Sequence, residues 1–474
     1  MSREIELKLE VARDDAEQLM RQPWLHPAEC RSARQVSTYF DTSDNALRRR
    51  GYTLRVRQSG DRFIQTVKSL GEGAGLFDRG EWEYQIDGSA PDAEKLCHTP
   101  LADLDTDLLG PVVCSDVVRT SCRVKLDGAD IELDADLGRI SAGARSAPLS
   151  EVEIELRRGD AAALVSLARR IASQAPVKLG VLTKAERGFA LADARLGKVT
   201  KAEPVAIRPE MTVAQGFEAI VNGCIRHFRL NEDLVIEKRT PEALHQARVA
   251  MRRLRAGLSL FRSAIMDSEF PRLRDELRWF TGELGDARNL DVFLQRELPP
   301  DQRRQLTENR EAAYDRVIAA LDSTRFRTLM LDLVTWAALG PWHDHANAGL
   351  PIEPYVNRRI DRLWNRISAA DHLTRMDEEE RHELRILIKK IRYALEFVHA
   401  LHAHEGQRQK KFARALEDLQ ETLGLLNDAA VARTMVASDA WPILPEEQGE
   451  EEMELLRHAD HALDRLHKVG PYWR

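Results

Sequence analysis

The sequence predicts two folded parts of different class: an α+β part with a dominant antiparallel sheet, followed by an all-helical part. Two observations lead to this prediction. Apolar residues recur at every second position in much of residues 3–200, which is the period of a half-buried strand. From Thr212 to the C-terminus they recur at every third or fourth position, which is the period of an amphipathic helix.

Alternation predicts the strands of the first part. Ile5, Leu7 and Leu9 alternate with charged residues, and the same pattern recurs at residues 54–57, 131–136 and 151–156. Residues 81–84 and 119–126 are further strand candidates, and turn signals rich in Gly and Asp separate the strands. Helical patterns at residues 14–22 and 160–174 interrupt the sheet.

A short linker separates the two parts. Pro204 and Pro209 cannot continue a helix, and the residues around them are mostly charged or small. We place the first domain at residues 1–197, the linker at 198–210 and the helical domain at 211–474. Breaks between helices are expected at residues 299–300, 340–341, 349–354 and 441–445, where Pro and Gly gather.

An internal repeat divides the helical domain. A motif with cations at offsets 0, 3, 7 and 10 occurs twice, as His245, Arg248, Arg252 and Arg255 and as His382, Arg385, Lys389 and Arg392. Gly285 and Gly424 follow the two histidines after 40 and 42 residues. Two helical bundles related by a pseudo-twofold axis, at about residues 211–340 and 350–474, explain this repeat.

Length and composition bound the class of protein. A chain of 474 residues with 43% hydrophobic and 31% charged residues is neither disordered nor fibrous, and it predicts about two to four domains. Its 70 basic and 77 acidic residues give a net charge of −7. No global positive field attracts nucleic acid, so no nucleic-acid partner is expected.

Three features predict a cytoplasmic protein that does not contact a membrane. The five cysteines are odd in number and contain no C-x-x-C pair, which suggests a reducing compartment and no zinc cluster. The longest apolar stretch, residues 329–342, is interrupted by Asp332 and does not predict a membrane span. The N-terminus carries no apolar leader.

Charges on the predicted strands segregate by sign. Acidic residues occur at Glu4, Glu6, Glu81, Glu83, Glu132, Asp134, Glu151, Glu153 and Glu155, and basic residues at Lys8, Arg55, Arg57, Lys68, Arg119, Arg123, Lys184 and Arg187. For one strand alone, a solvent-exposed face is the simpler interpretation. If the sheet closes, both sets line one cavity, and their burial is costly without a ligand. Carboxylates suit Mg²⁺ or Mn²⁺ and Arg and Lys suit phosphate, so a metal-bound polyphosphate would satisfy both sets.

These residues resemble the CYTH family, the triphosphate tunnel metalloenzymes, over about residues 2–195. The matching motifs are Glu4-Ile5-Glu6-Leu7-Lys8, Tyr39-Phe40-Asp41-Thr42, Leu54-Arg55-Val56-Arg57, Lys68, Arg79-Gly80-Glu81-Trp82-Glu83 and Glu151-Val152-Glu153-Ile154-Glu155. Thr183-Lys184 stands where the family commonly has Ser-Lys. The resemblance implies an antiparallel eight-stranded β-barrel around a tunnel, in which triphosphates are hydrolysed or rearranged with a metal.

The same resemblance implies roles for single residues. The expected catalytic residues are Glu4, Glu6, Lys8, Glu153 and Glu155. The expected ligands of Mg²⁺ or Mn²⁺, with two ions bound beside the substrate, are Glu4, Glu6, Asp134, Glu151, Glu153 and Glu155. The residues expected to bind the phosphates are Lys8, Arg55, Arg57, Lys68, Arg119, Arg123 and Lys184.

The repeated cations predict a basic ridge on each of two helices. At about 100° per residue, the four offsets fall within an arc of about 80°, beside an apolar stripe. A solvated basic face is the alternative for a single helix, but like charges at this spacing are destabilising without an anion. Two ridges that meet at a pseudo-twofold axis would form one cationic groove.

This half resembles the CHAD family, the conserved histidine α-helical domains, over about residues 210–474. The resemblance implies that inorganic polyphosphate binds to His245, Arg248, Arg252, Arg253, Arg255, His382, Arg385, Lys389, Lys390 and Arg392. The second copy, with Lys389 in place of an arginine, is the looser match. Metal binding by the two motif histidines is disfavoured, because cations flank each of them.

Together the resemblances predict a protein similar to bacterial inorganic triphosphatases. The expected reaction is metal-dependent hydrolysis of inorganic triphosphate to pyrophosphate and phosphate, with polyphosphate bound by the helical domain. The alternatives are a polyphosphate-binding or targeting protein with little catalysis, a thiamine-triphosphatase or an adenylate-cyclase-like enzyme. Trp24, Phe77 and Trp82 are the aromatic candidates for an organic substrate. The expected location is the cytoplasm, including polyphosphate granules.

Overall fold

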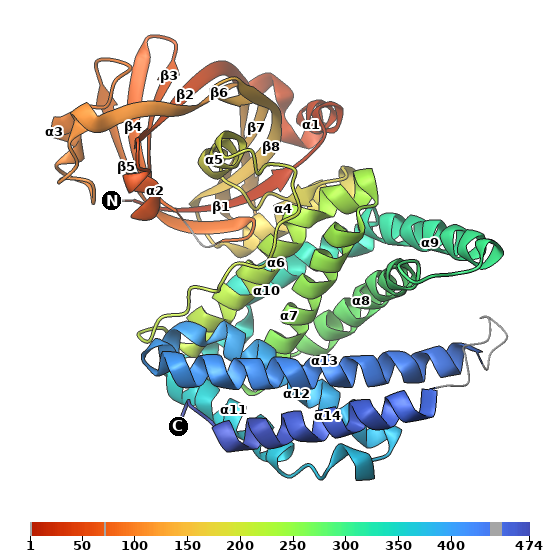
Figure 1. Ribbon diagram of the computed structural model, residues 1–474. Coiled ribbons are helices and arrows are strands. Elements are labelled where there is room, and N and C mark those ends of the chain that lie inside the picture. The colour runs from red at the N-terminus through yellow and green to blue at the C-terminus, as the bar shows by residue number, and fades with distance from the viewer. Residues whose placement is uncertain (1, 71–72, 437–447) are drawn as a thin grey trace.

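The computed structural model describes residues 2–70, 73–436 and 448–474, and within them nine strands form one antiparallel sheet. The strands are β1 (Ser2–Glu10), β2 (Arg31–Thr42), β3 (Tyr52–Ser59), β4 (Arg62–Ser69), β5 (Leu76–Ile86), β6 (Leu109–Leu126), β7 (Ala129–Ala142), β8 (Arg145–Arg158) and β9 (Lys178–Leu179). Their order is β5-β4-β3-β2-β6-β7-β8-β1-β9, and β1 also pairs with β5. The eight long strands therefore close on themselves, which confirms the predicted eight-stranded tunnel (Figure 1).

Alternation along β1 sends its side chains into two environments. Leu7 and Leu9 belong to an apolar core shared with Leu19 and Leu164, which lie on two flanking helices. Glu6 and Lys8 point instead into the enclosed interior, where both are buried. The charged face that alternation predicts is therefore enclosed by the sheet and does not face bulk solvent.

Helices α1 (Arg13–Met20), α2 (Ala46–Arg49), α3 (Ala93–Leu96), α4 (Ala162–Gln174) and α5 (Lys184–Ala192) accompany the sheet. Helix α5 lies against β6, β7 and β8 at the inner side of the closed sheet (Figure 1). A capping box fixes its start: Thr183 Oγ1 accepts from Glu186 N at 3.2 Å, and Glu186 Oε2 accepts from Thr183 N at 2.8 Å. Lys184 is consequently held as the first residue of the helix.

The second half of the chain is helical, as predicted. Its helices are α6 (Val213–Lys238), α7 (Pro241–Ile265), α8 (Phe270–Phe293), α9 (Pro300–Leu321), α10 (Thr324–Leu339), α11 (Ile352–Ser368), α12 (Glu378–Phe397), α13 (Gly406–Val436) and α14 (Gln448–Val469). The short 3₁₀ turns of the chain are Pro23–Leu25, Pro27–Glu29, Thr106–Leu108, Pro341–Asp344, Leu373–Arg375 and His399–Glu405. The predicted breaks near residues 300, 340 and 350 each separate two helices, whereas residues 441–445 lie outside the described residues. None of the described helices has the length and hydrophobicity needed to cross a bilayer.

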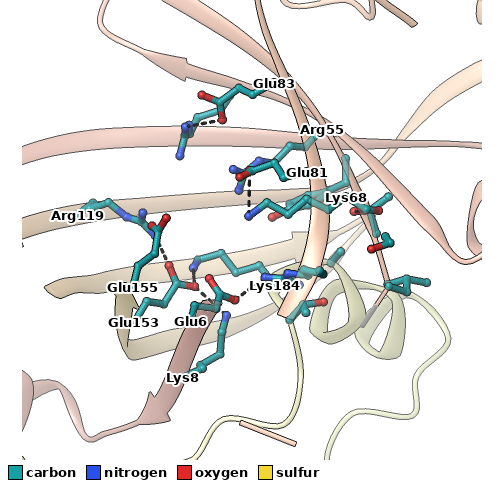
Figure 2. A pocket seen from close by; sticks show the side chains of 18 of the residues that line it. Glu6, Lys8, Arg55, Lys68, Glu81, Glu83, Arg119, Glu153, Glu155 and Lys184 are labelled. Carbon is teal, nitrogen blue, oxygen red and sulfur yellow. Dashed lines mark hydrogen bonds and ion pairs between the residues drawn. The ribbon is translucent and has the colours of Figure 1, made fainter. Parts of the chain in front are cut away.

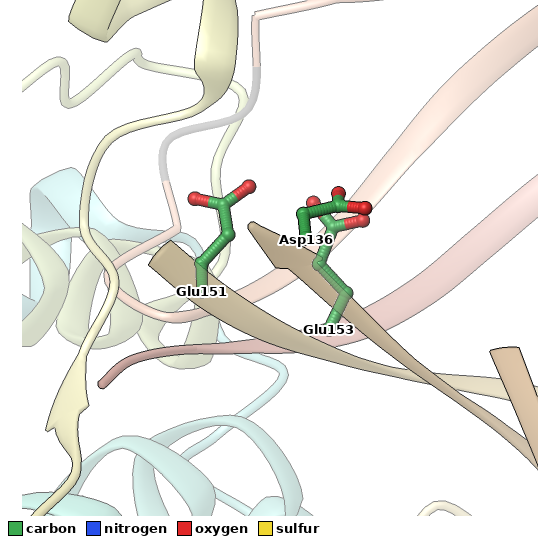
Figure 3. Close-up of side chains that lie close together, drawn as sticks. All are labelled: Asp136, Glu151 and Glu153. Carbon is green, nitrogen blue, oxygen red and sulfur yellow. The ribbon is translucent and has the colours of Figure 1, made fainter. Parts of the chain in front are cut away.

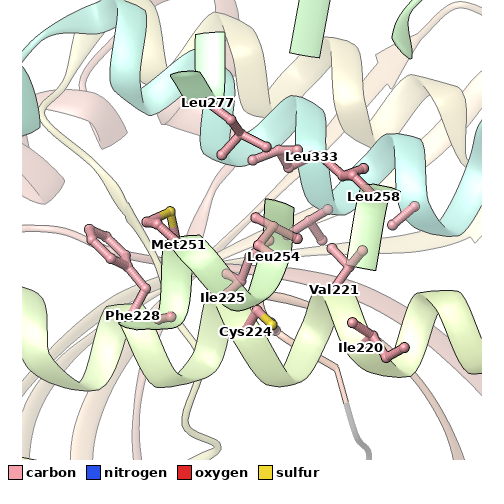
Figure 4. Close-up of a cluster of buried hydrophobic side chains, with 14 of the residues drawn as sticks. Ile220, Val221, Cys224, Ile225, Phe228, Met251, Leu254, Leu258, Leu277 and Leu333 are labelled. Atoms are coloured by element: carbon pink, nitrogen blue, oxygen red, sulfur yellow. The ribbon is translucent and has the colours of Figure 1, made fainter. Parts of the chain in front are cut away.

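The core of the helical half is built from the stripes that recur at three and four residues. Figure 4 shows side chains of α6 and α7 meeting those of α8 and α10: Val221, Cys224, Ile225, Phe228, Met251, Leu254, Leu258, Leu277 and Leu333. All of them are buried. Burial of one such leucine contributes about 1.5–3 kcal/mol, so this stripe explains why the helices pack where they do.

A disulfide joins Cys30 to Cys122, although the two residues are 92 positions apart in the chain. Strand pairing brings them together, because Arg31 at the start of β2 lies opposite Ser121 of β6. Cys97, Cys114 and Cys224 are free. The prediction of a reducing compartment from the odd cysteine count loses its support, because two of the five cysteines form this disulfide.

Candidate active site and cationic groove

The interior of the closed sheet is a charged cavity of about 170 Å³. Strands β1, β3, β4, β5, β6 and β8 and helix α5 all contribute side chains to it (Figure 2). Its charged lining residues are Glu6, Lys8, Arg55, Arg57, Lys68, Arg79, Glu81, Glu83, Arg119, Glu153, Glu155, Arg157 and Lys184. Carboxylates and cations therefore share one enclosed space, and β1, β5 and β8 each contribute both.

Two lysines meet a group of buried carboxylates at one side of this cavity. Lys8 Nζ lies 2.8 Å from Glu153 Oε1 and 3.2 Å from Glu151 Oε1. Lys184 Nζ lies 2.8 Å from Glu153 Oε1 and 2.7 Å from Asp136 Oδ2, and it also pairs with Glu151. Strand register creates these contacts, because Lys8 is directly opposite Glu153 and Asp136 is directly opposite Glu151.

Opposite charges keep this group ionised despite its burial. Burial alone would lower the pKa of Lys184, but Asp136, Glu151 and Glu153 together raise it well above its ordinary value. Burial would likewise raise the pKa of Glu153, but Lys184, Lys8 and Arg119 hold that pKa well below its ordinary value. The lysines therefore remain cationic and Glu153 remains anionic at neutral pH.

Arg119 of β6 extends the group toward β7. Its Nε donates to Asp136 Oδ1 at 2.8 Å and its Nη1 donates to Asp134 Oδ2 at 2.6 Å. Its Nη2 also donates to Glu153 Oε2. Burial raises the pKa of Asp134, and Arg119 opposes that shift. Asp134 is thus a partner of Arg119 and is not among the residues that line the cavity.

The wall formed by β3 and β4 is basic, with partners on β5. Lys68 Nζ lies 3.1 Å from Glu81 Oε1, and Arg57 Nη2 lies 3.5 Å from Glu83 Oε2. The neighbouring Arg55, together with burial and Arg119, lowers the pKa of Arg57 to about 10. Part of the shift comes from repulsion by Arg55 and Arg119, which an anion bound at this wall would relieve.

The acidic residues of the cavity fit a hard divalent cation. Asp136, Glu151 and Glu153 have carboxylate oxygens within 4.8 Å of one another (Figure 3), which is the kind of ligand that Mg²⁺ and Mn²⁺ prefer. Lys184 pairs with all three carboxylates, so ammonium groups already balance this triad. Glu6, Glu153 and Glu155 line the cavity itself, where Arg79, Lys8 and Arg157 pair with them in turn.

Most of the residues predicted for the tunnel meet in this cavity: Glu6, Lys8, Arg55, Arg57, Lys68, Arg119, Glu153, Glu155 and Lys184. Glu151 is buried beneath them as a partner of both lysines. The side chain of Glu4 lies outside the described part of the structure. Arg123 lies apart from the cavity, with 73% of its side chain exposed, because it stands further along the long strand β6.

Glu81 and Glu83 were predicted for the lining without an assigned role, whereas Arg79, Asp136 and Arg157 were missing from the predicted set. Arg157 follows Glu155 by two positions and pairs with it at 2.6 Å. Arg79 precedes Glu81 by two positions and pairs with Glu6 of β1. The two-residue alternation along β5 and β8 could therefore have predicted Arg79 and Arg157 as residues of the site.

A second concave surface lies between α7, α8 and α12 and has a volume of about 340 Å³. We call it the cationic groove, after its lining residues Arg252, Arg255, Arg262, Arg274, Arg278, Lys389 and Lys390. The described residues that line it include no carboxylate. Leu258, Phe270, Ile386 and Tyr393 add apolar surface.

Crowded like charges depress pKa values along this groove. Burial, together with Arg252 and Arg288, lowers the pKa of Arg248 to about 10. Burial and the nearby Arg278 also lower the pKa of Arg255. Burial is the larger cause of each shift, and a bound polyanion would relieve the part that comes from like-charge repulsion.

The predicted ridge residues do not all face the groove. Arg252, Arg255, Lys389 and Lys390 line it, whereas Arg253 is only 1% exposed. The Arg253 guanidinium lies 2.9 Å from Glu396 and 5.4 Å from the Phe397 ring centre, inside the helical core. Lys390 has the same offset of 8 in the second copy and does line the groove, so the two copies differ at this position.

The two copies of the motif make equivalent contacts. Arg255 Nη1 donates to Thr281 Oγ1 at 3.1 Å, and Arg392 Nε donates to Gln420 Oε1 at 2.6 Å. The two acceptors each stand four residues before a glycine, Gly285 and Gly424 respectively. The internal repeat of the sequence is therefore also a repeat of side-chain contacts.

Comparisons with known proteins agree with this architecture. The CYTH domain model matches residues 2–189, and the CHAD domain model matches residues 219–437. An inorganic triphosphatase from Haemophilus influenzae is 30% identical over 158 residues, which are 33% of this chain and 45% of that protein. This chain thus spans less than half of the length of that relative.

Two solved structures are also similar to this chain. The CHAD domain from the plant Ricinus communis is 28% identical, with a TM-score of 0.45, and covers 58% of this chain and 93% of its own. A Hippeastrum protein described as having a dominant triphosphatase activity is 19% identical, with a TM-score of 0.31, and covers 42% of this chain and 97% of its own. The two domain matches, in this order and without overlap, identify the chain as a CYTH–CHAD protein.

Proposed function

We propose that the CYTH domain hydrolyses inorganic triphosphate to pyrophosphate and phosphate with Mg²⁺ or Mn²⁺. The observation that supports this proposal is the enclosed cavity whose lining brings many carboxylates and many cations together. Burial of such charges is costly unless a ligand compensates them, and a metal-bound triphosphate compensates both signs. The similarity to an inorganic triphosphatase supports the same activity.

In this proposal the basic wall binds the phosphates. Arg55, Arg57 and Lys68 bind phosphate oxygens, and the lowered pKa of Arg57 returns toward its ordinary value once an anion is present. Lys8, Lys184 and Arg119 keep Glu153 ionised and oriented. Glu6, Glu153 and Glu155 hold the divalent cation, and Glu4 is the expected further ligand.

Hydrolysis in such a site needs alignment and charge neutralisation more than a covalent nucleophile. A bound divalent cation supplies charge neutralisation and lowers the pKa of a water molecule. The water oxygen forms a bond to the terminal phosphorus, and the bond from that phosphorus to the bridging oxygen breaks. The leaving pyrophosphate takes the electron pair, and Arg55 and Arg57 balance its charge. One proton of the water stays on the released phosphate, and the other passes to solvent.

The cavity favours an inorganic substrate over an organic triphosphate. The three aromatic candidates are not among the residues that line the cavity. The Arg170 guanidinium carbon lies 4.2 Å from the centre of the Trp24 ring, and Phe77 is fully buried. The ring centres of Trp82 and Tyr52 are 6.4 Å apart. Tyr39 is the single aromatic residue among the described residues that line the cavity. A nucleobase or a thiazolium ring would find little apolar surface there.

Phosphate release from three substrates tests this proposal. The full chain is assayed with inorganic triphosphate, ATP and thiamine triphosphate, each with Mg²⁺, Mn²⁺ or a chelator. We expect the highest kcat/KM with inorganic triphosphate and no turnover with the chelator. Preference for ATP or thiamine triphosphate would contradict the proposed substrate, and tight triphosphate binding without turnover would favour the alternative of a binding protein.

We further propose that the cationic groove binds inorganic polyphosphate. Seven cationic side chains without a described carboxylate among them match a chain of repeating phosphates. Binding of this kind weakens steeply with salt, because the ligand releases counterions. Such binding would also bring the protein to polyphosphate granules.

A further inference from the structure

The segment from β9 to α5 touches both lysines of the tunnel. Gly180 N donates to Lys8 O at 2.9 Å, and a Cβ atom on Gly180 would lie only 2.5 Å from Lys8 Cγ. Four residues later, Lys184 begins α5 and reaches Asp136 and Glu153. The position of residues 178–187 therefore sets the position of both ammonium groups.

Arg226 of α6, in the helical domain, holds this segment on both sides of Lys184. Its Nη1 donates to the backbone oxygen of Val181, and its Nη2 donates to Glu186 Oε1 at 2.9 Å. The other carboxylate oxygen of Glu186 closes the capping box with Thr183 N. One guanidinium thus fixes the backbone before Lys184 and the cap of the helix that Lys184 begins.

Arg229, one helical turn further along α6, holds the start of the same segment. Its Nε donates to Leu179 O at 2.8 Å, and its Nη2 lies 3.2 Å from Glu10 Oε2 at the end of β1. The Arg229 side chain is 2% exposed and also pairs with Glu232. Burial would lower the pKa of Arg229, but Glu232 and Glu10 raise it, so the charge persists in the buried site.

We propose that Arg226 and Arg229 of the CHAD domain are positioning residues for Lys184 and Lys8 of the CYTH tunnel. This inference rests on the proposed function, since it assigns the two arginines to the same reaction. The ammonium groups of Lys184 and Lys8 lie only 2.7–2.8 Å from carboxylate oxygens, so a small displacement of either lysine would break these contacts. A misplacement of about 1 Å in an active site can cost about a hundredfold in rate. The helical domain would then be part of the catalytic unit as well as a binding module.

A double-mutant cycle on kcat/KM for triphosphate tests whether Arg226 acts through Lys184. We expect Arg226→Ala and Lys184→Ala each to lower kcat/KM by about 10- to 100-fold. We expect the double variant to be no worse than Lys184→Ala alone, because the arginine has no other route to the reaction. Multiplied losses in the double variant would overturn the inference.

Arg169→Ala is the matched control. Arg169 of α4 lies 2.6 Å from Asp332 of α10, so it crosses the same domain interface without touching residues 178–187. We expect its kcat/KM to stay within about twofold of the wild type, as for an independent site. We expect Arg226→Lys, which keeps a cation beside Glu186, to recover part of the activity. If Arg169→Ala lowered kcat/KM as much as Arg226→Ala does, Arg226 would act only by docking the two domains, and the positioning role would be contradicted.

Amide hydrogen exchange in the full chain separates this inference from the proposed function. Arg226→Ala should speed exchange of the amides of α5 by about tenfold or more, because the cap loses its anchor, while Arg169→Ala should not. This measurement needs no turnover. A wild type that cleaves no triphosphate would contradict the proposed function, and unchanged exchange in α5 would contradict the positioning role.

Discussion

Gly180 packs directly on the aliphatic stem of Lys8, which is itself 1% exposed. A methyl group there would lie 2.5 Å from Lys8 Cγ and 2.9 Å from its Cδ, so the stem must move. We expect Gly180→Ala to lower kcat/KM for triphosphate by about tenfold while the chain stays folded. The control is Gly282→Ala, where a methyl group meets nothing within 4 Å. Full activity of Gly180→Ala would show that Lys8 is dispensable or more mobile than this packing implies.

The buried carboxylates of the tunnel also predict a pH dependence of stability. Lys184 and Arg119 lower the pKa of Asp136 against the effect of burial, and the pKa of Glu153 falls in the same way. A folded-state pKa below the unfolded value stabilises the fold above the unfolded pKa of about 4, and this stabilisation is lost as the pH falls. We expect the unfolding temperature to drop from about pH 5 to 3.

Asp136→Asn isolates this contribution. The variant removes one ionised partner of Lys184, so its unfolding temperature should depend less on pH over the same range. It should also be less stable at neutral pH, by about 3–5 kcal/mol, because buried cations lose a counter-charge. Asp301→Asn, at a position whose side chain is 92% exposed, should change neither quantity. Equal pH slopes for both variants would contradict the assignment.

Alternation predicted which side chains would be enclosed by the sheet, but it did not predict which of them would contact one another. Glu6, Lys8, Arg55 and Arg57 were predicted to face inward because they alternate with apolar residues. The pairing of Lys8 with Glu153 depends on the register between β1 and β8, which are 145 positions apart at that pair. Arg123 shares the alternation of Arg119, yet the cavity ends before it reaches that point of β6. The closed sheet sets strand length and register, so the alternation of a single strand could not predict them.

Helices α7 and α12 contribute the motif cations that line the cationic groove. We expect Arg252→Glu combined with Arg255→Glu to remove retention on immobilised polyphosphate and to leave triphosphate hydrolysis within about twofold of the wild type. Arg304→Glu combined with Arg316→Glu on α9 gives the same change of net charge at exposed positions outside the groove. That control should still bind the polymer. Retention by the groove variant would contradict the assignment.

The helix pattern predicted these elements better than it predicted their single residues. The period of three and four separates the buried stripe of α7 from its cations, and the repeat predicted a second such helix. Arg253 was grouped with its neighbours in sequence, but it packs against Glu396 and Phe397, whereas Lys390 at the equivalent position of α12 lines the groove. Arg274 and Arg278 join the groove from α8, which the pattern of α7 or α12 alone could not predict, whereas Arg262 continues the face of Arg255 along α7.

Over the whole molecule, one apolar core continues from the sheet into the helices. Leu9, Val177 and Leu179 of the sheet domain and Met330 and Leu331 of α10 belong to the same buried cluster. We expect the full chain to unfold in a single calorimetric transition, because neither domain can lose its face of this core independently. Two transitions for the wild type would contradict a shared core.

Arg229→Met tests the polar part of this interface. The change leaves Glu10 and Glu232 without their buried partner, so we expect a loss of about 3–5 kcal/mol. We expect a second calorimetric transition to separate from the first. The sequence could predict neither this contact nor the Cys30–Cys122 disulfide, because both join residues that are distant in the chain and carry no periodic signal.

The rate of phosphate release from inorganic triphosphate by Glu6→Gln tests whether the carboxylates of the tunnel support a metal-dependent reaction. Glu6 lines the tunnel and is buried, and glutamine keeps its shape while it removes the charge that a divalent cation needs. Asp116→Asn, on an exposed ion pair of β6, is the control. With Mg²⁺ or Mn²⁺ present, the wild type and Asp116→Asn should turn over, and Glu6→Gln should be slower by about a hundredfold or more. Comparable rates for Glu6→Gln and the wild type would contradict a metal-dependent reaction in this tunnel.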